Sequence, residues 1–268
     1  MSQSIAKAIA LRKRFAELHE SGMFLMPNAF DVGSARVLQS LGFEAIATSS
    51  SGHAASLGRH DQQVFRDELV EHVAALSAAI DIPLSVDSER CFADDVEEIQ
   101  ETVAMLAAAG AAGISIEDYR PDVGIDAMDE ATERVAAATE AARTHAMVLT
   151  ARAENHLYGT GDLGDTLARL TAYREAGADC LYAPGLKTPE DISEVVALGS
   201  QVNVLVFQGA PTVSELGGLG VRRISTGGAM AFAAYGTVAA GARELLASGT
   251  SRYTEQLLSA EDRNAAFS

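Results

Sequence analysis

The chain has 268 residues, of which 48% are hydrophobic, and a formal net charge of −17 at pH 7. This length suits one large α/β domain with an ample core, and the apolar content excludes extensive disorder. The acidic balance argues against nucleic acid and anionic membranes as partners, because both require basic patches. Residues 1–20 lack the apolar segment of a signal peptide, and nothing approaches the ~18 apolar residues of a membrane span. Cys91 and Cys180 lie far apart, so we expect no disulfide framework and a cytoplasmic location.

Short apolar runs bounded by Pro or Gly recur along the chain and are typical of buried parallel strands. We expect these strands at Phe24–Asn28, Ala45–Thr48, Ile82–Asp87, Gly113–Glu117, Met147–Arg152, Cys180–Ala183, Val202–Phe207 and Arg222–Thr226. Segments rich in Ala and Leu separate them and predict helices such as Val96–Ala109, Met128–Thr144, Leu163–Glu175 and Thr212–Leu219. Eight strands that alternate with helices predict a single-domain (β/α)₈ TIM barrel over residues 1–268, with a C-terminal helical segment at 229–268. A doubly wound open sheet is the alternative.

Polar residues gather where the expected strands end, whereas the starts of the strands show no such gathering. These residues are Asn28, Asp31, Thr48–Ser51, Asp87, Glu89, Glu117, Asp118, Arg152, Glu154, Asn203 and Ser225. In a barrel the carboxyl ends of all strands meet at one face, where the loops build the site. The third and fourth strands would therefore bring several carboxylates together, and a hard divalent cation such as Mg²⁺ would relieve their repulsion.

Two further features suit a small anion. The turn Thr48–Gly52 is rich in N–H and O–H donors that can hold a carboxylate or phosphonate, although a helix-capping turn has the same composition. Arg152 ends an apolar strand and needs an anionic partner. That partner is either a substrate carboxylate or a structural salt bridge to Glu117 or Glu154. Asn28, Asp31, Asn203 and Ser225 could line the pocket or satisfy backbone groups at strand ends.

Eight short motifs occur in order from about residue 20 to residue 245. They are Pro27–Asp31, Gly42–Ser50, Ser56–Asp61, Asp87–Glu89, Ile116–Asp118, Thr150–Arg152, Ala176–Asp179 and Arg222–Ser225. Together they resemble the isocitrate lyase/phosphoenolpyruvate mutase superfamily. The resemblance implies a (β/α)₈ barrel that makes or breaks a C–C or P–C bond next to a 2-oxo acid with the help of Mg²⁺, for which Mn²⁺ is a substitute.

The resemblance also implies roles for individual residues. Asp87 would bind Mg²⁺ directly, while Glu89 and Glu117 would act largely through water, as is normal for this ion. Asp61 would complete the outer shell of the metal or position the substrate, and together with Arg152 it forms the expected catalytic pair. An ordinary loop carboxylate is the other interpretation of Asp61. The residues expected to bind substrate are Ser49, Ser50, Ser51, Asn28, Arg152 and Asn203.

The loop after the fourth strand departs from the lyases of this superfamily. Those lyases carry a Lys-Arg/Lys-Cys-Gly-His loop whose Cys supplies a proton, whereas the matching segment Tyr119–Asp126 contains no Cys, Lys or His. Where the lyases use a Glu after the sixth strand and an Arg after the eighth, this chain has Tyr182–Gly185 and Thr226–Gly228. A second carboxylate clamp and isocitrate itself are therefore not expected.

The expected function is Mg²⁺-dependent cleavage of a C–C bond next to a small 2-oxo or 2-hydroxy acid, through an enolate-like intermediate. The alternatives are a P–C bond enzyme of the phosphonopyruvate hydrolase or phosphoenolpyruvate mutase type, a related aldolase that runs in the condensing direction, and a barrel that binds a 2-oxo acid without turnover. The resemblance further implies a homo-oligomer, a dimer or tetramer, in which the C-terminal helix Ala229–Leu246 lies at the contact and is exchanged between subunits.

Overall fold

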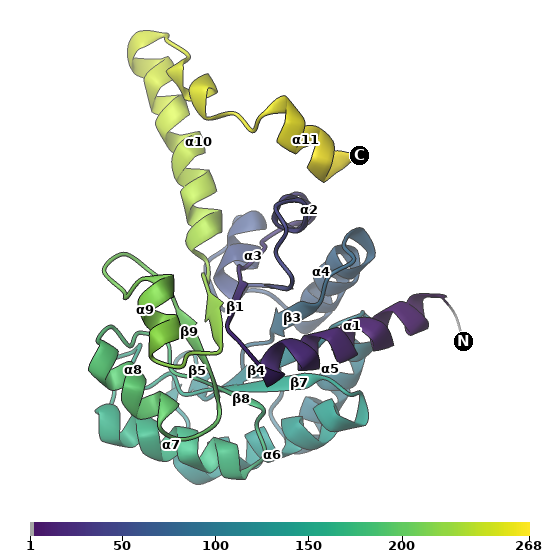
Figure 1. Ribbon diagram of the computed structural model, residues 1–268, viewed down its shortest axis with the longest axis vertical. Helices are drawn as coiled ribbons and strands as arrows, with labels where there is room; N and C mark the ends of the chain where they lie inside the picture. The colour runs from purple at the N-terminus through teal and green to yellow at the C-terminus, as the bar shows by residue number, and fades with distance from the viewer. Residues whose placement is uncertain (1–2) are drawn as a thin grey trace.

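The computed structural model describes residues 3–268 and has eight parallel strands surrounded by helices (Figure 1). The strands are β1 (Phe24–Met26), β2 (Ile46–Ala47), β3 (Leu84–Asp87), β4 (Gly113–Glu117), β7 (Val148–Arg152), β8 (Cys180–Tyr182), β9 (Gln201–Leu205) and β10 (Arg223–Ser225). Their spatial order follows the chain, and an isolated parallel bridge between Asn28 and Ala47 joins the two outermost strands, β1 and β2. The sheet is therefore a nearly closed barrel, which agrees with the predicted TIM barrel. An open doubly wound sheet would reverse its strand order.

Helices fill the connections between the strands. They are α1 (Gln3–Glu20), α2 (Val32–Ser40), α3 (Ser50–Ser56), α4 (Arg66–Ala79), α5 (Val96–Ala108), α6 (Met128–Thr144), α7 (Leu163–Glu175), α8 (Pro189–Val196), α9 (Val213–Gly218), α10 (Ala229–Ser248), the 3₁₀ turn η1 (Arg252–Gln256) and α11 (Ala260–Phe267). Polar side chains cap many of them: Asp95 accepts from the Glu98 N–H, for example. Gly110 and Gly177, at φ of 105° and 98°, follow the ends of α5 and α7, as expected for left-handed terminators.

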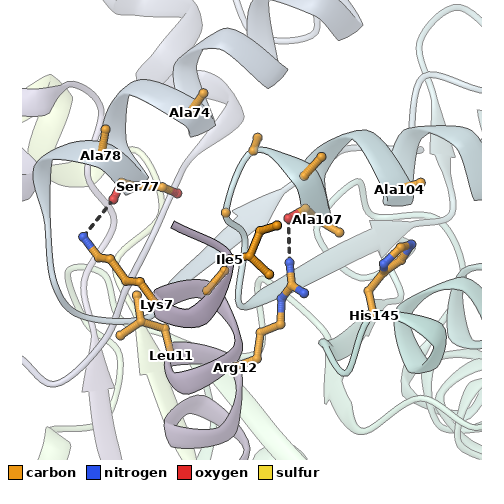
Figure 2. Close-up of a pocket in the computed structure, with 14 residues that line it drawn as sticks. Ile5, Lys7, Leu11, Arg12, Ala74, Ser77, Ala78, Ala104, Ala107 and His145 are labelled. Carbon is orange, nitrogen blue, oxygen red and sulfur yellow. Dashed lines mark hydrogen bonds between the residues drawn. The ribbon is translucent and has the colours of Figure 1, made fainter. Parts of the chain in front are cut away.

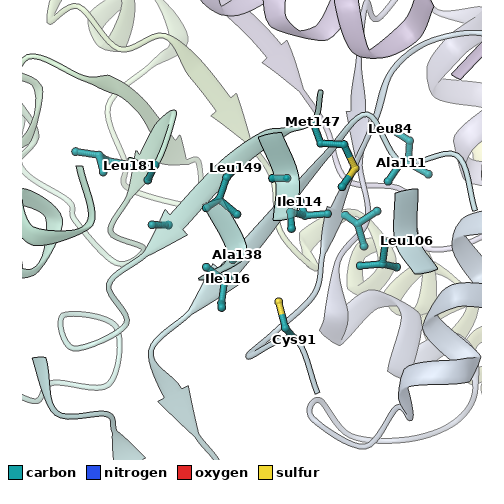
Figure 3. Close-up of a cluster of buried hydrophobic side chains, with 14 of the residues drawn as sticks. Leu84, Cys91, Leu106, Ala111, Ile114, Ile116, Ala138, Met147, Leu149 and Leu181 are labelled. Atoms are coloured by element: carbon teal, nitrogen blue, oxygen red, sulfur yellow. The ribbon is translucent and has the colours of Figure 1, made fainter. Parts of the chain in front are cut away.

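The main core lies between the strands and the helices. Figure 3 shows Ile114, Leu149 and Leu181 from three adjacent strands together with Leu106 of α5 and Ala138 of α6. All are almost completely buried. Burial of each large aliphatic side chain contributes about 1.5–3 kcal/mol, so this layer fixes the strand positions on which the site depends.

A smaller apolar cluster closes the amino-terminal end of the barrel. Phe15 and His19 of α1 meet Phe24 of β1 in edge-to-face contacts, with ring centroids 4.7–6.2 Å apart. A Cβ on Gly113 would come within 2.5 Å of the Phe15 ring, so only glycine lets α1 approach the start of β4 this closely. Helix α1 therefore covers the base of the barrel.

The C-terminal region leaves the barrel. Helix α10 projects from the carboxyl ends of the strands, and η1 and α11 return toward α2 (Figure 1). Several large apolar side chains on α10 face solvent: Phe232, Val238 and Leu246 are 56%, 68% and 89% exposed. Exchange of this helix between subunits stays a prediction. No helix in residues 3–268 is long and apolar enough to cross a membrane.

Candidate active site

A cavity of about 180 Å³ lies at the carboxyl ends of the strands. Eight predicted site residues line it: Asn28, Ser49, Ser50, Ser51, Asp61, Asp87, Arg152 and Asn203. Glu89 and Glu117 are buried but are not among the lining residues. The expected clustering at one face of the barrel is therefore present, with Asp87 as the strand-end carboxylate that borders the open space.

Arg152, the last residue of β7, is the centre of the charge arrangement. Its three guanidinium nitrogens contact Asp87 at 2.6 Å, Glu117 at 3.1 Å and Glu154 at 2.8 Å. The parallel pairing of β4 with β7 sets Glu117 opposite Arg152, which explains one of these contacts directly. The ring of Tyr182 packs against the guanidinium with a centroid distance of 5.3 Å. The structural salt bridge anticipated for Arg152 is thus formed, and its contact with substrate stays a prediction.

The carboxylates around Arg152 outnumber its single positive charge. Burial, together with the charges of Asp87 and Asp61, raises the pKa of Glu89 to about 8. Burial also raises the pKa of Asp61, with Asp87 adding to the effect, and it raises the pKa of Glu117 against the opposing influence of Arg152. The acids therefore lie close enough to repel one another, and an added cation would be stabilised among them.

The donor set suits Mg²⁺, because carboxylate oxygens combined with water are what this ion accepts. In the described part of the chain, no three acidic, His or Cys side chains converge into one direct ligand group. A site with one direct carboxylate and several waters needs no such group. Asp87 lines the cavity and fits the role of the direct ligand. The contribution of Glu89 and Glu117 through water stays a prediction.

The serine turn serves two structural purposes at once. Ser49 is the N-cap of α3, and its hydroxyl accepts from the Gly52 N–H at 3.2 Å. The Ser50 N–H donates to Asp87 at 3.0 Å, and Thr48 Oγ1 accepts from the Asp87 N–H at 2.9 Å. The turn thus holds the cavity carboxylate in place and leaves the Ser49 and Ser51 hydroxyls, 3.1 Å apart, on the wall. The helix-capping interpretation is correct and is compatible with binding.

The two asparagines line the cavity and satisfy strand-end groups as well. Asn28 donates to the Thr48 carbonyl at 2.5 Å and accepts from the Thr226 and Gly227 N–H groups, both at 2.9 Å, so it ties together the ends of β1, β2 and β10. Asn203 donates to Ser225 at 2.9 Å. Asp31, by contrast, caps α2 through a 2.6 Å bond from the Ser34 N–H and is not a lining residue.

The segment after β4 forms a small hairpin in place of a cysteine loop. Its strands are β5 (Tyr119–Arg120) and β6 (Gly124–Ile125). Tyr119 stacks on Tyr158 of the loop after β7, with ring centroids 3.8 Å apart. Below the hairpin, Asp118 accepts from the Glu154 N–H at 2.8 Å and from the Tyr173 hydroxyl at 2.5 Å. These contacts fix the segment that follows Glu117 at the end of β4 and the loop that carries Glu154.

The loop after β3 is conformationally strained. Glu89, Cys91 and Phe92 all have positive φ, at 48°, 62° and 52°. Left-handed backbone costs roughly 1 kcal/mol or more for each residue other than glycine. The surrounding structure maintains it: Arg134 donates to the Arg90 carbonyl at 2.8 Å, and Ser88 donates to the Ser115 carbonyl. In this conformation Glu89 lies near enough to Asp87 and Asp61 for their charges to raise its pKa.

Tyr182 and Arg223 are among the lining residues that the sequence did not identify as site residues. Tyr182 ends β8, and its hydroxyl is hydrogen-bonded to Ser225, while burial raises its pKa and keeps it protonated. Arg223 begins β10 and is only 2% exposed. A sequence signal for Arg223 did exist, because it stands two residues before Ser225 and side chains two apart in a strand share a face.

A larger cavity of about 570 Å³ lies elsewhere, between α1, α4 and α5 (Figure 2). Alanines form much of its wall. Its two cations are already engaged, since Lys7 donates to the Ile80 carbonyl at 2.7 Å and Arg12 to the Ala107 carbonyl at 2.5 Å. These contacts satisfy carbonyls at the ends of α4 and α5 and attach α1 to the barrel. His145 and Ser77 complete its polar lining, and none of the described residues that line it carries a carboxylate.

Comparison with known proteins agrees with this geometry. A family model for phosphoenolpyruvate phosphomutase matches residues 15–246. The structure of a lyase/mutase of unassigned specificity from Burkholderia cenocepacia J2315 superimposes with a TM-score of 0.93 at 43% identity, covering 96% of each chain. A phosphonomutase structure from the same organism has a TM-score of 0.82 at 36% identity, covering 91% of this chain and all of the other. An oxaloacetate decarboxylase of Bradyrhizobium sp. (strain BTAi1) is 30% identical over 74% of this chain and 70% of its own. The chain therefore belongs to the phosphoenolpyruvate mutase/isocitrate lyase superfamily.

Proposed function

We propose that this protein is a Mg²⁺-dependent lyase that cleaves a carbon–carbon bond next to the carbonyl or hydroxyl of a small 2-oxo or 2-hydroxy acid. The observation that carries the proposal is the cavity wall itself. Asp87 borders the cavity within 2.6 Å of Arg152 and 3.0 Å of the Ser50 N–H, so a cation ligand, a guanidinium and amide donors meet at one place. The relatives named as oxaloacetate decarboxylases support the choice of reaction class.

Each group of cavity residues would have a different role in the proposed reaction. Asp87, assisted through water by Glu89 and Glu117, would hold Mg²⁺, which when bound supplies Lewis-acid stabilisation of the negative charge that develops on a 2-oxo acid. The turn Ser49–Ser51 would orient the substrate carboxylate through its hydroxyls and N–H groups. Arg152 would balance charge next to the reacting group. Asp61 and the protonated Tyr182 hydroxyl are the lining groups able to accept or donate a proton.

The size of the cavity restricts the substrate. A cavity of about 180 Å³ is small for a ligand site and suits a compact acid of a few carbons. The absence of cysteine from the hairpin β5–β6 also separates this site from the isocitrate-cleaving lyases.

The test is a panel of 2-oxo and 2-hydroxy acids incubated with the protein in Mg²⁺ or in EDTA, with pyruvate and carbon dioxide measured as products. We expect one small acid to give Mg²⁺-dependent release, and Asp87→Asn to abolish it. The matched control is Asp122→Asn, which removes an exposed carboxylate of the hairpin and is expected to leave the rate unchanged. Tight binding of the acids without release of any product would contradict the proposal and favour a binding protein.

A second candidate is P–C bond chemistry, which the phosphoenolpyruvate phosphomutase family match favours specifically. Phosphonopyruvate belongs in the same panel, because hydrolysis would release inorganic phosphate and mutase action would yield phosphoenolpyruvate. Either product in the absence of C–C cleavage would replace the first candidate with this one.

The proposed assembly is a homo-oligomer that covers the exposed apolar face of α10. Phe232, Val238 and Leu246 would otherwise remain in water at a cost that a second copy of the chain can remove. Gly228, the N-cap residue of α10, lines the cavity, so a contact at this helix would also stabilise the mouth of the site.

A further inference from the structure

The two arginines that line the cavity have opposite electrostatic surroundings. Arg152 contacts three carboxylates, so its charge is more than neutralised by the protein. Arg223 contacts three neutral groups: Asn203 Oδ1 at 2.9 Å, Thr150 Oγ1 at 2.8 Å and His19 Nε2 at 3.3 Å. Within residues 3–268, Arg223 forms no salt bridge to a carboxylate. The uncompensated positive charge of the cavity is therefore that of Arg223.

The neighbours of Arg223 are electrically neutral and leave its positive charge uncompensated. His19 donates from Nδ1 to the Phe15 carbonyl at 2.7 Å, so its Nε2 carries the lone pair that accepts from Arg223. Thr150 and Asn203 present oxygen acceptors in the same way. A guanidinium has five N–H donors, and the three contacts use only three of them. Two donors thus have no protein acceptor among the described residues.

A buried charge without a counterion is costly, and an anion that reaches it recovers part of that cost. Arg223 is 2% exposed and borders the same cavity as Asp87 and Ser50, so one small molecule can contact both ends. We propose that Arg223, with Asn203 and Ser225, forms a second anion subsite in the depth of the barrel, which takes the distal carboxylate of a short dicarboxylic acid.

This inference deepens the proposed function, on which it rests for the position of the first carboxylate at the serine turn. It changes the substrate class from any small 2-oxo acid to a four-carbon acid with a carboxylate at each end. It also adds a second positive group to the sequence-based assignment, in which Arg152 was the only arginine expected to contact the substrate. A guanidinium held by neutral partners attracts an anion more strongly than one surrounded by acids.

The test compares succinate with butyrate, two four-carbon acids that differ by one carboxylate. Both lack a 2-oxo group, and binding is measured in EDTA by calorimetry, so the result is independent of Mg²⁺ and of any turnover. We expect succinate to bind at least about tenfold more tightly than butyrate to the wild-type protein, because a charge-assisted contact is added. In Arg223→Gln this ratio is expected to fall close to one, whereas Arg223→Lys retains part of it.

Arg222→Gln is the matched control. Its side chain donates to Gln201 and to the Gly22 carbonyl and is not part of the cavity wall, so the ratio should stay at its wild-type value. An equal affinity of the wild-type protein for the two acids would overturn the subsite, and this measurement holds even where Arg223→Gln fails to fold. A tenfold preference that persists in a folded Arg223→Gln protein would overturn it as well. Absence of Mg²⁺-dependent product release would contradict the lyase proposal alone.

Discussion

His19 gives the stability of this protein a pH dependence that can be calculated from its surroundings. Burial of the His19 side chain between α1 and the barrel, with Arg223 beside it, lowers the pKa of His19 from 6.5 to about 3. The folded protein therefore keeps the imidazole neutral, while the unfolded chain binds a proton as the pH falls below 6.5. The stabilising contribution is complete above the unfolded value of 6.5 and is lost progressively as the pH falls toward 3.

The size of the effect follows from the two pKa values. At pH 5 the unfolded imidazole is almost fully protonated and the folded one is almost fully neutral. Linkage then predicts a loss of about 2 kcal/mol in the free energy of unfolding between pH 7 and pH 5 from this one group. That is a large part of the 5–15 kcal/mol typical of a folded domain.

Urea unfolding at pH 7 and pH 5, at one fixed protein concentration, measures this loss. The variant His19→Gln removes the titrating group, so its loss over the interval should be smaller than that of the wild type by about 2 kcal/mol. The measured quantity is the free energy of unfolding at pH 7 minus that at pH 5. A general destabilisation by the substitution lowers both values equally and therefore cancels. His60→Gln, at an exposed loop position, is the control and should behave as the wild type. An unchanged loss in His19→Gln would refute the reasoning.

Three further predictions concern the site and the assembly. Arg152→Ala should lower the free energy of unfolding by about 3–5 kcal/mol, because Glu117 and Glu154 then stay buried without a counterion. Calorimetry should show that the substitution weakens the binding of 2-oxo acids more than it weakens the binding of Mg²⁺. Equal losses of affinity for both ligands would argue for a purely structural arginine. Tyr173→Phe should destabilise the protein by about 1–3 kcal/mol in urea unfolding through loss of the 2.5 Å bond to Asp118, and wild-type stability would show that bond to be dispensable. Leu246→Glu on the exposed face of α10 should reduce the mass measured by light scattering, and a wild-type protein that is already a monomer would remove the proposed interface.

The eight strands could be predicted from the sequence because each is a short apolar run between turn residues. Gly113–Glu117 matches β4 at both ends, and the other strands differ from expectation by a few residues at their ends. β2 is reduced to Ile46–Ala47, since the backbone beyond it turns immediately into the N-cap Ser49. The hairpin β5–β6 could not be foreseen, because its two-residue strands have no periodicity to detect.

The predicted site residues came together because parallel strands end at a common face. Their individual partners could not be foreseen, since a sequence does not say which of several acids a guanidinium will contact. The sequence left open whether Arg152 contacts a substrate carboxylate or a protein carboxylate. In the fold it contacts three protein carboxylates at once. Arg223 appeared only as part of a family motif. Its importance depends on the neutrality of Thr150, Asn203 and His19, which come from three distant segments.

The position of α1 across the amino-terminal end of the barrel has a consequence for molecular traffic. Phe15 packs against Gly113, and His19 contacts Arg223, at the amino-terminal end of the barrel. The substrate and products of the proposed reaction would therefore enter and leave through the loops at the carboxyl ends of the strands, where Leu157 lines the cavity. A product held at this mouth would delay the departure of a second product formed deeper in the cavity.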